Sequence, residues 1–548
     1  MLLPAVLLLP VASGLLATLL PAFGIFPALG GTHLSLDPWR ALFAWPGLGG
    51  SVALTLWTGL CATALSLATA LGVAVAARRA RVLRAAQAAI VPLLATPHAA
   101  LAIGFAFLAA PSGWIARLLS PGLTGWTAPP DVAIVHDRWG GALILGLWLK
   151  ETPYLLLMIL AALTQAAPGA SLRVGAALGY APWRAWLLTV LPRIWPQLRL
   201  PVLAVLAFSL SVVDVALVLG PGTPPPLAVQ VLRWFDDPDL ANWYPGCAGA
   251  MLLAALVVLC GGALLACERV VAAIGSRLLQ SGRRGGGDGD FPALAAGGIA
   301  AALGLGSLAV LALWAGAASW RFPDALPQHW RVAAVMGRWT GLGDATAATL
   351  WIGAASTLLA LALAIGGLRG GRVPTAMPPG MIIYLPLLVP QVAFLFGFQV
   401  LLVRLRLDGG GLALVWTHLT FVLPYVVLAL DRPFQALDPR YARTAASLGA
   451  SPARVLWRVT LPLLARPLLA AAAVGFAVSA GLYLPTLFAG AGRVATLTTE
   501  AVTLASGGDR RVLAATALAQ AGLPLLVFAV AVGLPSWRAR ARRGVAIA

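Results

Sequence analysis

Two stretches of the sequence decide the fold, and they are copies of one pattern. The first reads Arg173-Val-Gly-Ala-Ala-Leu-Gly179-Tyr-Ala-Pro182-Trp-Arg184 and ends at Leu191-Pro192. The second reads Arg443-Thr-Ala-Ala-Ser-Leu-Gly449-Ala-Ser-Pro452-Ala-Arg454 and ends at Leu461-Pro462. At an offset of 270 residues, eight of the twenty aligned positions are identical, both glycines and all four prolines among them. Each copy is a polar interruption in an otherwise apolar chain. The repetition of the pattern indicates that a large unit of the chain is duplicated.

The composition places most of the chain in a membrane. Of the 548 residues, 60% are hydrophobic and 10% are charged, whereas soluble proteins carry about 25% charged residues. Twelve apolar runs have the length of a transmembrane helix, near 3–27, 51–77, 87–110, 141–166, 198–220, 247–274, 292–316, 345–368, 379–403, 411–430, 467–490 and 513–535. Because a bilayer core offers no water to unpaired backbone groups, continuous runs of this kind predict helices, and hence an all-α integral membrane fold.

Further pairs of motifs extend the duplication across both halves. In chain order they are Thr55-Leu-Trp57-Thr-Gly59 with Thr349-Leu-Trp351-Ile-Gly353, Pro97-His98 with Pro390-Gln391, Gly104-Phe105 with Gly397-Phe398, and Pro153-Tyr154 with Pro424-Tyr425. The matches keep one order, so we predict a first repeat over 1–275 and a second over 292–548, each with about six spans. A Gly- and Arg-rich linker over 276–291 joins them. An even number of spans makes the two repeats parallel.

The net charge of +19 comes from Arg residues in the loops, and their distribution does not indicate a nucleic-acid-binding surface. Arg residues gather in alternate loops and at the C-terminus, the pattern that places such loops in the cytoplasm. Both repeated stretches and both termini are therefore predicted to be cytoplasmic. The start Met1-Leu-Leu-Pro4 has no basic segment, so we interpret it as part of the first span and not as a signal peptide. We expect no nucleic acid partner.

Local signals predict a turn and a short helix in each repeated stretch. The glycines mark a turn, and Ser451-Pro452 is typical of an N-cap followed by proline at the first helical position. Leu191-Pro192 and Leu461-Pro462 are expected to end the helix, because proline lacks a backbone N–H. Such a helix could transmit a push from a docked protein, or could simply anchor the loop at the membrane surface.

Both stretches resemble the cytoplasmic signature loop of bacterial ABC importer permeases, in which Glu-Ala-Ala is followed by Gly and later by Leu-Pro. Gly179 to Pro192 and Gly449 to Pro462 each span the required thirteen positions, although Arg173 and Arg443 stand where that pattern has Glu. The two-half chain resembles the fused permeases of the thiamine and ferric-iron type. The resemblance implies the type I importer fold in a bacterial inner membrane, with two cytoplasmic ATPase subunits and a periplasmic substrate-binding protein as partners. The ATPase-coupling residues that it implies are Arg173, Leu178, Gly179, Pro182, Arg184, Leu191, Pro192, Arg443, Leu448, Gly449, Pro452, Arg454, Leu461 and Pro462.

The sequence shows no ATP-hydrolysing domain and no catalytic site. A phosphate-binding loop needs a glycine-rich turn with a lysine, and the only lysine, Lys150, lies in an apolar run. We find no catalytic constellation, and the four cysteines lack metal-site spacing. We therefore expect no cofactor or metal on this chain, and ATP to be used by partner subunits.

Polar residues inside the spans are candidates for the path of a small-molecule substrate. They are His98, Lys150, Glu151, Asp214 and Gln391. Lys150 and Glu151 could instead neutralise each other or lie near the membrane edge. The loops at 111–140, 221–246, 320–344 and 491–512 are the candidates for docking a binding protein. The alternatives are a twelve-span ion-coupled secondary transporter, which would use Lys150, Glu151 and Asp214 as a relay, and a structural or assembly protein of the membrane.

Overall fold

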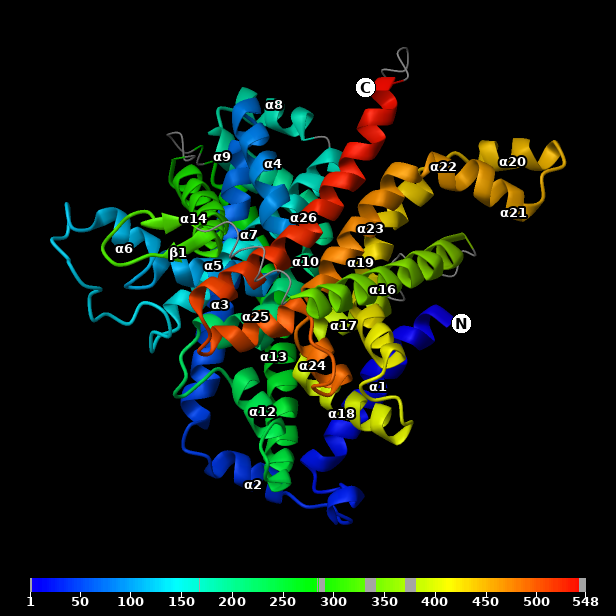
Figure 1. Cartoon of the computed structure of the whole chain (residues 1–548). Coiled ribbons are helices and arrows are strands. Elements are labelled where there is room, and N and C mark those ends of the chain that lie inside the picture. Colours follow the sequence, from blue (N-terminus) through cyan, green and yellow to red (C-terminus); the bar gives the residue numbers. More distant parts are fainter. Residues whose placement is uncertain are drawn as a thin grey trace.

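The computed structural model describes residues 2–166, 168–282, 284, 291–330, 342–369 and 381–541. Four predicted segments lie partly outside the described residues: residues 283 and 285–290 of the linker over 276–291, much of the docking loop at 320–344, the start of the run at 379–403, and the end of the C-terminal basic segment. Figure 1 shows a bundle of helices with two groups of short helices, α8–α9 and α20–α22, at one end.

The first half consists of helices joined by short turns. They are α1 (Leu2–Ala22), α2 (Asp37–Ala44), α3 (Leu48–Ala76), α4 (Ala80–Ala95), α5 (His98–Ala109), α6 (Trp114–Leu119), α7 (Gly141–Ala166), α8 (Gly169–Ala177), α9 (Pro182–Ala185), α10 (Leu191–Ser211), α11 (Asp214–Leu219), α12 (Leu227–Phe235) and α13 (Trp243–Gln280). The short helical turns are η1 (Pro27–Leu29), η2 (Trp186–Val190) and η3 (Leu240–Asn242).

The second half repeats this order and adds a small hairpin. Its elements are α14 (Phe291–Gly316), β1 (Ala317–Ser319), β2 (His329–Trp330), α16 (Gly343–Arg369), α17 (Met381–Leu388), α18 (Gln391–Arg404), α19 (Gly411–Gln435), α20 (Pro439–Ser447), α21 (Pro452–Val455), η4 (Leu456–Thr460), α22 (Leu461–Leu463), α23 (Ala465–Ala480), α24 (Leu484–Gly490), α25 (Leu497–Ala505) and α26 (Arg510–Ala541). Strands β1 and β2 pair antiparallel.

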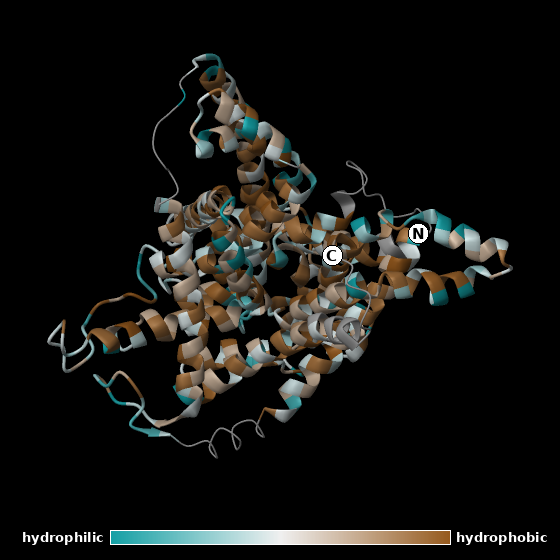
Figure 2. Cartoon of the chain, turned by 90° about the horizontal axis from the view of Figure 1, so that it is seen from above, coloured by the Kyte–Doolittle hydropathy of each residue, from teal (hydrophilic) through white to brown (hydrophobic). Residues whose placement is uncertain are grey.

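The predicted all-α membrane fold is confirmed. Among the described residues, nine helices are long and apolar enough to cross a membrane, and a bent pair, Pro452–Leu463 with Ala465–Ala480, makes a tenth. Two shorter apolar helices, Val6–Ala22 and Gln391–Arg404, match the remaining predicted runs. Several spans are broken at the prolines and glycines seen in the sequence, as between α4 and α5 at Pro97. Figure 2 shows hydrophobic residues along most helices and hydrophilic ones concentrated toward the projecting ends.

The first helix of each half packs on the other half. Helix α1 lies against α18, where the Thr18 hydroxyl accepts a hydrogen bond from the Gly397 N–H at 3.2 Å. In the same way α14 lies against α5, at the contact of Ser307 with Gly104. The largest hydrophobic core accordingly contains residues of both halves, Leu101 and Phe394 among them. The two halves therefore form a single packed body.

The repeated Thr-Leu-Trp motif has the same structural task in both halves. The Thr55 hydroxyl accepts a hydrogen bond from the Leu227 N–H, the first residue of α12, at 2.9 Å. The Thr349 hydroxyl accepts one from the Leu497 N–H, the first residue of α25, at 3.0 Å. Each hydroxyl satisfies one of the N–H groups that have no partner at a helix start. The motif thus positions a short helix at the end of the bundle opposite α8–α9 and α20–α22.

Candidate functional site

The end of the molecule that carries both repeated stretches, which we name the loop face, is built from two matching turns. Helices α8 and α20 each end in a left-handed glycine, Gly179 with φ of 76° and Gly449 with φ of 80°. Only glycine adopts this conformation without steric cost, and it closes a helix C-terminus. The turns predicted at these two glycines are therefore present in both copies.

After each turn the chain starts a new helix at proline. Pro182 and Pro452 occupy the first helical turn of α9 and α21. In the second copy the Ser451 hydroxyl accepts a hydrogen bond from the Arg454 N–H at 3.3 Å, as the sequence predicted. The first copy has Ala181 at this place, and its N–H donates to the carbonyl of Arg284 in the segment that joins the two halves. The joining segment therefore reaches the first loop.

The prediction that Leu-Pro ends each short helix is wrong for the first copy. Residues 182–211 form one continuous 30-residue helix through Leu191-Pro192. The reason is the π-helical turn η2 just before it, repeated as η4 in the second copy. A π turn shifts the backbone hydrogen bonds locally, so that the missing N–H of proline is accommodated. In the second copy the chain bends by 78° between Leu463 and Ala465, after Pro462.

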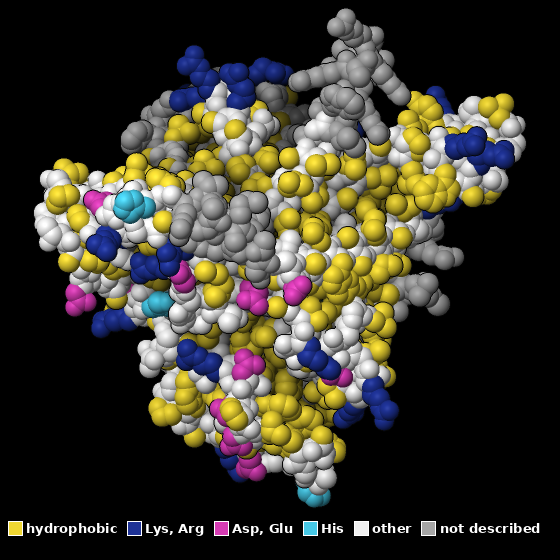
Figure 3. Space-filling model, in the orientation of Figure 1, with side chains coloured by type: hydrophobic (Ala, Val, Ile, Leu, Met, Phe, Trp, Pro, Cys, Tyr) yellow, Lys and Arg dark blue, Asp and Glu magenta, His cyan; other side chains and the backbone are white. Residues whose placement is uncertain are grey.

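The two loops consequently differ in how far they project. Leu187 of the first copy is half-buried, whereas Trp457, at the equivalent position of the second copy, is 70% exposed. Figures 1 and 3 show the α20–α22 segment as an arm that extends away from the bundle and carries basic side chains, all of them Arg. Leu178 and Leu448, which end α8 and α20, are 53% and 83% exposed. Both copies thus present a leucine beside the glycine turn.

Each of the two loops also carries arginines before and after its leucine. Arg173, Arg443 and Arg454 are exposed, and Arg184 is half-buried. None of the four has an ion pair among the contacts of the described residues. The loop face therefore offers apolar and cationic groups together, which suits docking of another protein.

A cavity of about 230 Å³ lies between the two halves on the side of the loop face. Helices α7 and α10 of the first half and α17 and α19 of the second half line it. The repeat-related Tyr154 and Tyr425 form its inner part, and Gln197 and Arg432 stand nearer the loops, joined by a hydrogen bond of 3.4 Å. Because both halves line it, with the repeat-related helices α7 and α19 facing it from either side, this cavity is the candidate translocation path.

Three of the five predicted path residues come together beyond the tyrosines. The His98 ring nitrogen Nε2 lies 3.1 Å from Glu151 Oε1, and the imidazole packs on Phe208 with ring centroids 4.6 Å apart. Asp214, at the first turn of α11, interacts electrostatically with His98. All three belong to the first half. His98 and Asp214 stand at helix breaks, where Pro97 and the Val212–Val213 step interrupt the spans, and Glu151 lies within the continuous helix α7.

The other two predicted path residues are placed differently. The Lys150 ammonium donates hydrogen bonds to the carbonyls of Leu93 at 3.0 Å and Leu94 at 2.9 Å, and also to that of Thr96. It therefore caps the carboxyl end of α4. Lys150 and Glu151 are both buried within the protein, at 7% and 5% exposed. Gln391 begins α18 in the second half, at the position that repeats His98.

The sequence analysis missed several polar groups in the spans. His418 is buried, with Nδ1 2.8 Å from the Ser479 hydroxyl and Nε2 3.0 Å from the Thr486 hydroxyl. Tyr483 of the second half interacts electrostatically with Asp214 of the first. The tyrosines of the Pro-Tyr pairs were noted only as part of a matched motif. Their repetition in an apolar run was the signal that could have identified them.

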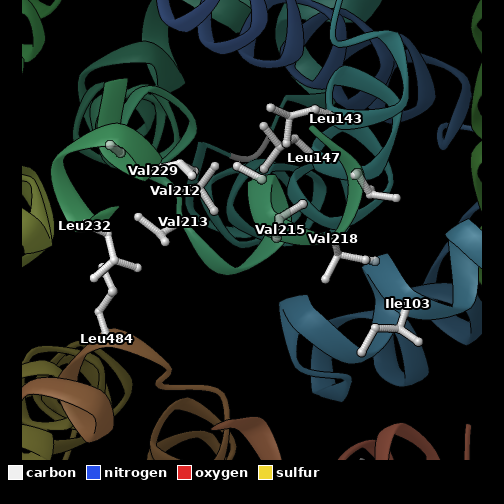
Figure 4. Packing of buried hydrophobic residues seen from close by; sticks show 14 of the residues in the cluster. Ile103, Leu143, Leu147, Val212, Val213, Val215, Val218, Val229, Leu232 and Leu484 are labelled. Carbon is white, nitrogen blue, oxygen red and sulfur yellow. The ribbon is translucent and has the colours of Figure 1, made fainter. Parts of the chain in front are cut away.

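Apolar packing closes the path on the side away from the loops. Figure 4 shows Val215 and Val218 of α11 between Leu143 and Leu147 of α7 and Ile103 of α5, and Leu232 of α12 opposite Leu484 of α24. All of these side chains are buried. A second cavity, of about 260 Å³, lies beyond Ile103 and Val218 and is lined by His136 and Arg510. These apolar side chains therefore separate the cavity on the loop side from the opposite end of the molecule.

Comparison with known proteins gives a consistent family. Residues 376–536 match the family described as binding-protein-dependent transport system inner membrane component. The chain is 35% identical over 521 residues to the inner membrane ABC transporter permease protein YnjC of Escherichia coli, covering 93% of each chain. It is 36% identical over 143 residues to the molybdenum transport system permease protein ModB of Mycobacterium tuberculosis, covering 24% of this chain and 53% of ModB. It is 32% identical over 89 residues to the spermidine/putrescine transport system permease protein PotC of Escherichia coli, covering 16% and 33%.

Proposed function

Because the chain belongs to the inner-membrane permease components of binding-protein-dependent ABC transporters, we propose that its two loops receive two ATPase subunits, one each. As a member of this family, the chain is the permease subunit of an ATP-driven importer. It forms the translocation path and is coupled to separate ATPase subunits. The relatives thereby favour ATP-driven import over the ion-coupled secondary transport that the sequence left open.

The observation that carries the proposal is the duplicated loop beside the cavity between the halves. Leu178 and Leu448 stand exposed beside Gly179 and Gly449, and would enter the two ATPase subunits. Each copy carries arginines before and after its leucine, and the residues from Pro182 to Pro192 and from Pro452 to Pro462 connect each loop to the next span. A push on either loop is passed to α10 or α23, which pack on the helices around the path.

The remaining assignments follow from this orientation. The loop face and both termini are cytoplasmic, and residues 276–291 join the two repeats. The partner subunits bind and hydrolyse ATP, and this chain carries no catalytic activity. A periplasmic substrate-binding protein docks on the opposite face, for which the loops at 111–140, 221–246, 320–344 and 491–512 are the candidates. Thiamine and ferric iron, the substrates of the fused permeases that the sequence resembles, are the first candidates for the solute.

The ATPase that co-purifies with the chain tests the coupling loops. We expect Leu178→Asp and Leu448→Asp each to lower the ATP hydrolysis recovered per permease, and the double variant to abolish it. Trp57→Ala is the matched control, because Trp57 is 53% exposed on α3, away from the loops. Undiminished hydrolysis with the double variant, or uptake that stops with a proton uncoupler and needs no ATPase, would contradict the proposal.

A further inference from the structure

The second cavity lies on the side of the molecule away from the loop face and has a volume of about 260 Å³. Ile103 of α5 and Val218 of α11 line it from the first half, and they lie close together in Figure 4. Trp314 of α14 and Leu504 of α25 line it from the second half. A molecule bound in this cavity would therefore contact both halves.

Among the described residues that line this cavity, Arg510 is the only one with a formal charge. Its guanidinium donates a hydrogen bond of 3.0 Å to the Ser112 hydroxyl and lies 5.8 Å from the centroid of the Trp314 ring. Both partners are neutral, and the neighbouring Asp509 carboxylate is bound by Arg511 at 2.7 Å. A guanidinium has five N–H donors, so those not bonded to Ser112 can bind a carboxylate in a two-pronged contact. The Arg510 side chain is thus held at the cavity while it keeps its positive charge.

A second arginine fixes the segment that carries Ser112. Arg117 is 3% exposed, and its guanidinium donates hydrogen bonds to the carbonyls of Ser112 at 2.9 Å and Arg321 at 2.7 Å. It also lies 5.7 Å from the centroid of the Trp314 ring, so Trp314 contacts two guanidiniums. Asp324 attracts Arg117 electrostatically but does not line the cavity. The positively charged side of the cavity is therefore built from residues that hold one another in place.

His136 contributes a second polar group to the lining. Its Nδ1 atom lies 2.6 Å from the Gly220 carbonyl oxygen, which can only accept, so Nδ1 carries a proton and donates it. The backbone of His136 has a φ of 60°, a left-handed conformation that is uncommon outside glycine and that occurs often at binding sites. The other ring nitrogen, Nε2, is the group that His136 can offer to a ligand. Both His136 and Arg510 are exposed, so a solute can reach the cavity from outside.

Most of the remaining lining is apolar. The rings of Phe107 and Trp314 lie with their centroids 5.9 Å apart, and Leu504 and Leu513 complete the wall. An inorganic oxyanion would leave this surface uncovered, whereas an organic body would bury it, which stabilises a complex. Benzene fits a cavity of about 150 Å³, so 260 Å³ is enough for an aromatic ring that carries a carboxyl group.

We propose that this cavity binds a small organic carboxylate, with the carboxylate on Arg510 and the apolar body against Trp314 and Phe107. The site goes beyond the permease function given above, because it is separate from the cavity on the loop side and needs no ATPase. A ligand stabilises the arrangement to which it binds best. Since this ligand contacts both halves, it favours the arrangement in which apolar side chains close the path on this side.

Protection of a thiol in the cavity tests the site. The four free cysteines are replaced by serine: Cys61, Cys247, Cys260 and Cys267. Ala505→Cys then places one thiol in the lining. Benzoate should slow the reaction of the purified full chain with neutral N-ethylmaleimide several-fold. At the same concentration and ionic strength, benzamide, which has the ring without the charge, and sulfate, which has charge without a ring, should protect much less. No protection by benzoate, or equal protection by benzamide or sulfate, would overturn the proposal.

A substitution of the charged residue assigns the protection to Arg510. Arg510→Gln keeps a hydrogen-bonding side chain near Ser112 but removes the charge, so benzoate should no longer protect the thiol. Arg404→Gln is the matched control, because it removes an exposed arginine at the end of α18 that does not line the cavity. It should leave the protection unchanged. Protection that survives Arg510→Gln, or that is lost equally with both variants, would refute the assignment of the carboxylate to Arg510.

Thermal unfolding of the chain with its native cysteines provides an independent measurement. Benzoate should raise the melting temperature in a concentration-dependent way, because a ligand that binds only the folded state stabilises it by mass action. Benzamide should not, and the Arg510→Gln protein should not respond to benzoate. If the Ala505→Cys chain does not fold, this measurement decides, and an unchanged melting temperature contradicts the proposal. No partner subunit is present, so this failure is distinct from a failure of the coupling loops to bind an ATPase.

Discussion

Gly14 of α1 and Gly397 of α18 touch backbone to backbone across the boundary between the two halves. A Cβ atom at Gly397 would lie 2.0 Å from the Gly14 carbonyl oxygen, and one at Gly14 would lie 2.1 Å from the Phe394 carbonyl oxygen. The same contact recurs between Gly104 and Ser307, where a Cβ at Gly104 would lie 2.5 Å from the Ser307 oxygen. Ser307 follows Gly14 by 293 positions, and Gly397 follows Gly104 by 293 positions. The first helix of each half therefore packs on the other half, α1 on α18 and α14 on α5, through repeat-related positions.

Gly397→Ala should lower the melting temperature of the protein. The added methyl group forces α1 away from α18, and overpacking of this kind typically costs about 1–3 kcal/mol. Gly262→Ala in α13 is the control, because nothing lies within 4 Å of its Cβ position. Alanine is a better helix former than glycine, so the control should melt at the same temperature or higher. Equal melting temperatures for the two purified variants would show that the α1–α18 contact is not this close.

Thr55→Val and Thr349→Val should destabilise the protein to a similar extent. Each removes the acceptor of a buried N–H at a helix start, Leu227 or Leu497, and an unsatisfied buried group costs about 1–3 kcal/mol. Thr58→Val is the control, because the Thr58 hydroxyl donates to the Leu54 carbonyl of its own helix. It should therefore shift the melting temperature less. Since the two sites share no contact, the double variant should lose the sum of the single effects.

Lys150→Met should reduce folding rather than substrate selection. The substitution keeps most of the apolar stem but leaves three carbonyls at the end of α4 without their donor. Each unsatisfied buried carbonyl costs about 1–3 kcal/mol. Gel filtration of the solubilised protein should show a smaller folded fraction, and Arg404→Met, an exposed substitution at the end of α18, should not. A fully folded Lys150→Met protein with altered substrate uptake would instead make Lys150 a path residue.

Helix content and the duplicated loops could be predicted from the sequence, because apolar run length and the repeated Gly and Pro positions are local signals. The packing of α1 and α14 on the opposite halves could not be predicted, because the hydrophobicity of a helix does not tell which other helix it packs against. Likewise Tyr154 and Tyr425 were visible as a matched pair, but their meeting in one cavity depends on how α7 and α19 pack. The sequence predicted that a helix ends at Pro192. The helix instead continues through a π turn, and proline spacing does not reveal such a turn.

Among the described residues, an exposed hydrogen bond joins the arm formed by α20–α22 to the bundle. The Arg369 guanidinium, at the end of α16, donates a hydrogen bond of 2.6 Å to the Pro452 carbonyl at the start of α21. Such a bond contributes about 0.5–1.5 kcal/mol, enough to shift a two-state equilibrium severalfold. Arg369→Ala should therefore raise the mobility of the arm, pivoting at the 78° bend after Leu463.

A spin label at Ala453→Cys, in the chain whose native cysteines are replaced by serine, measures that mobility. The Arg369→Ala spectrum should narrow, and the spectrum with Arg404→Ala should not change. If a docked ATPase subunit holds the arm, adding it should broaden the Arg369→Ala spectrum again, because the protein contact then replaces the lost hydrogen bond. A label that is equally immobile with and without Arg369 would show that packing around Val455, which is 8% exposed, fixes the arm by itself.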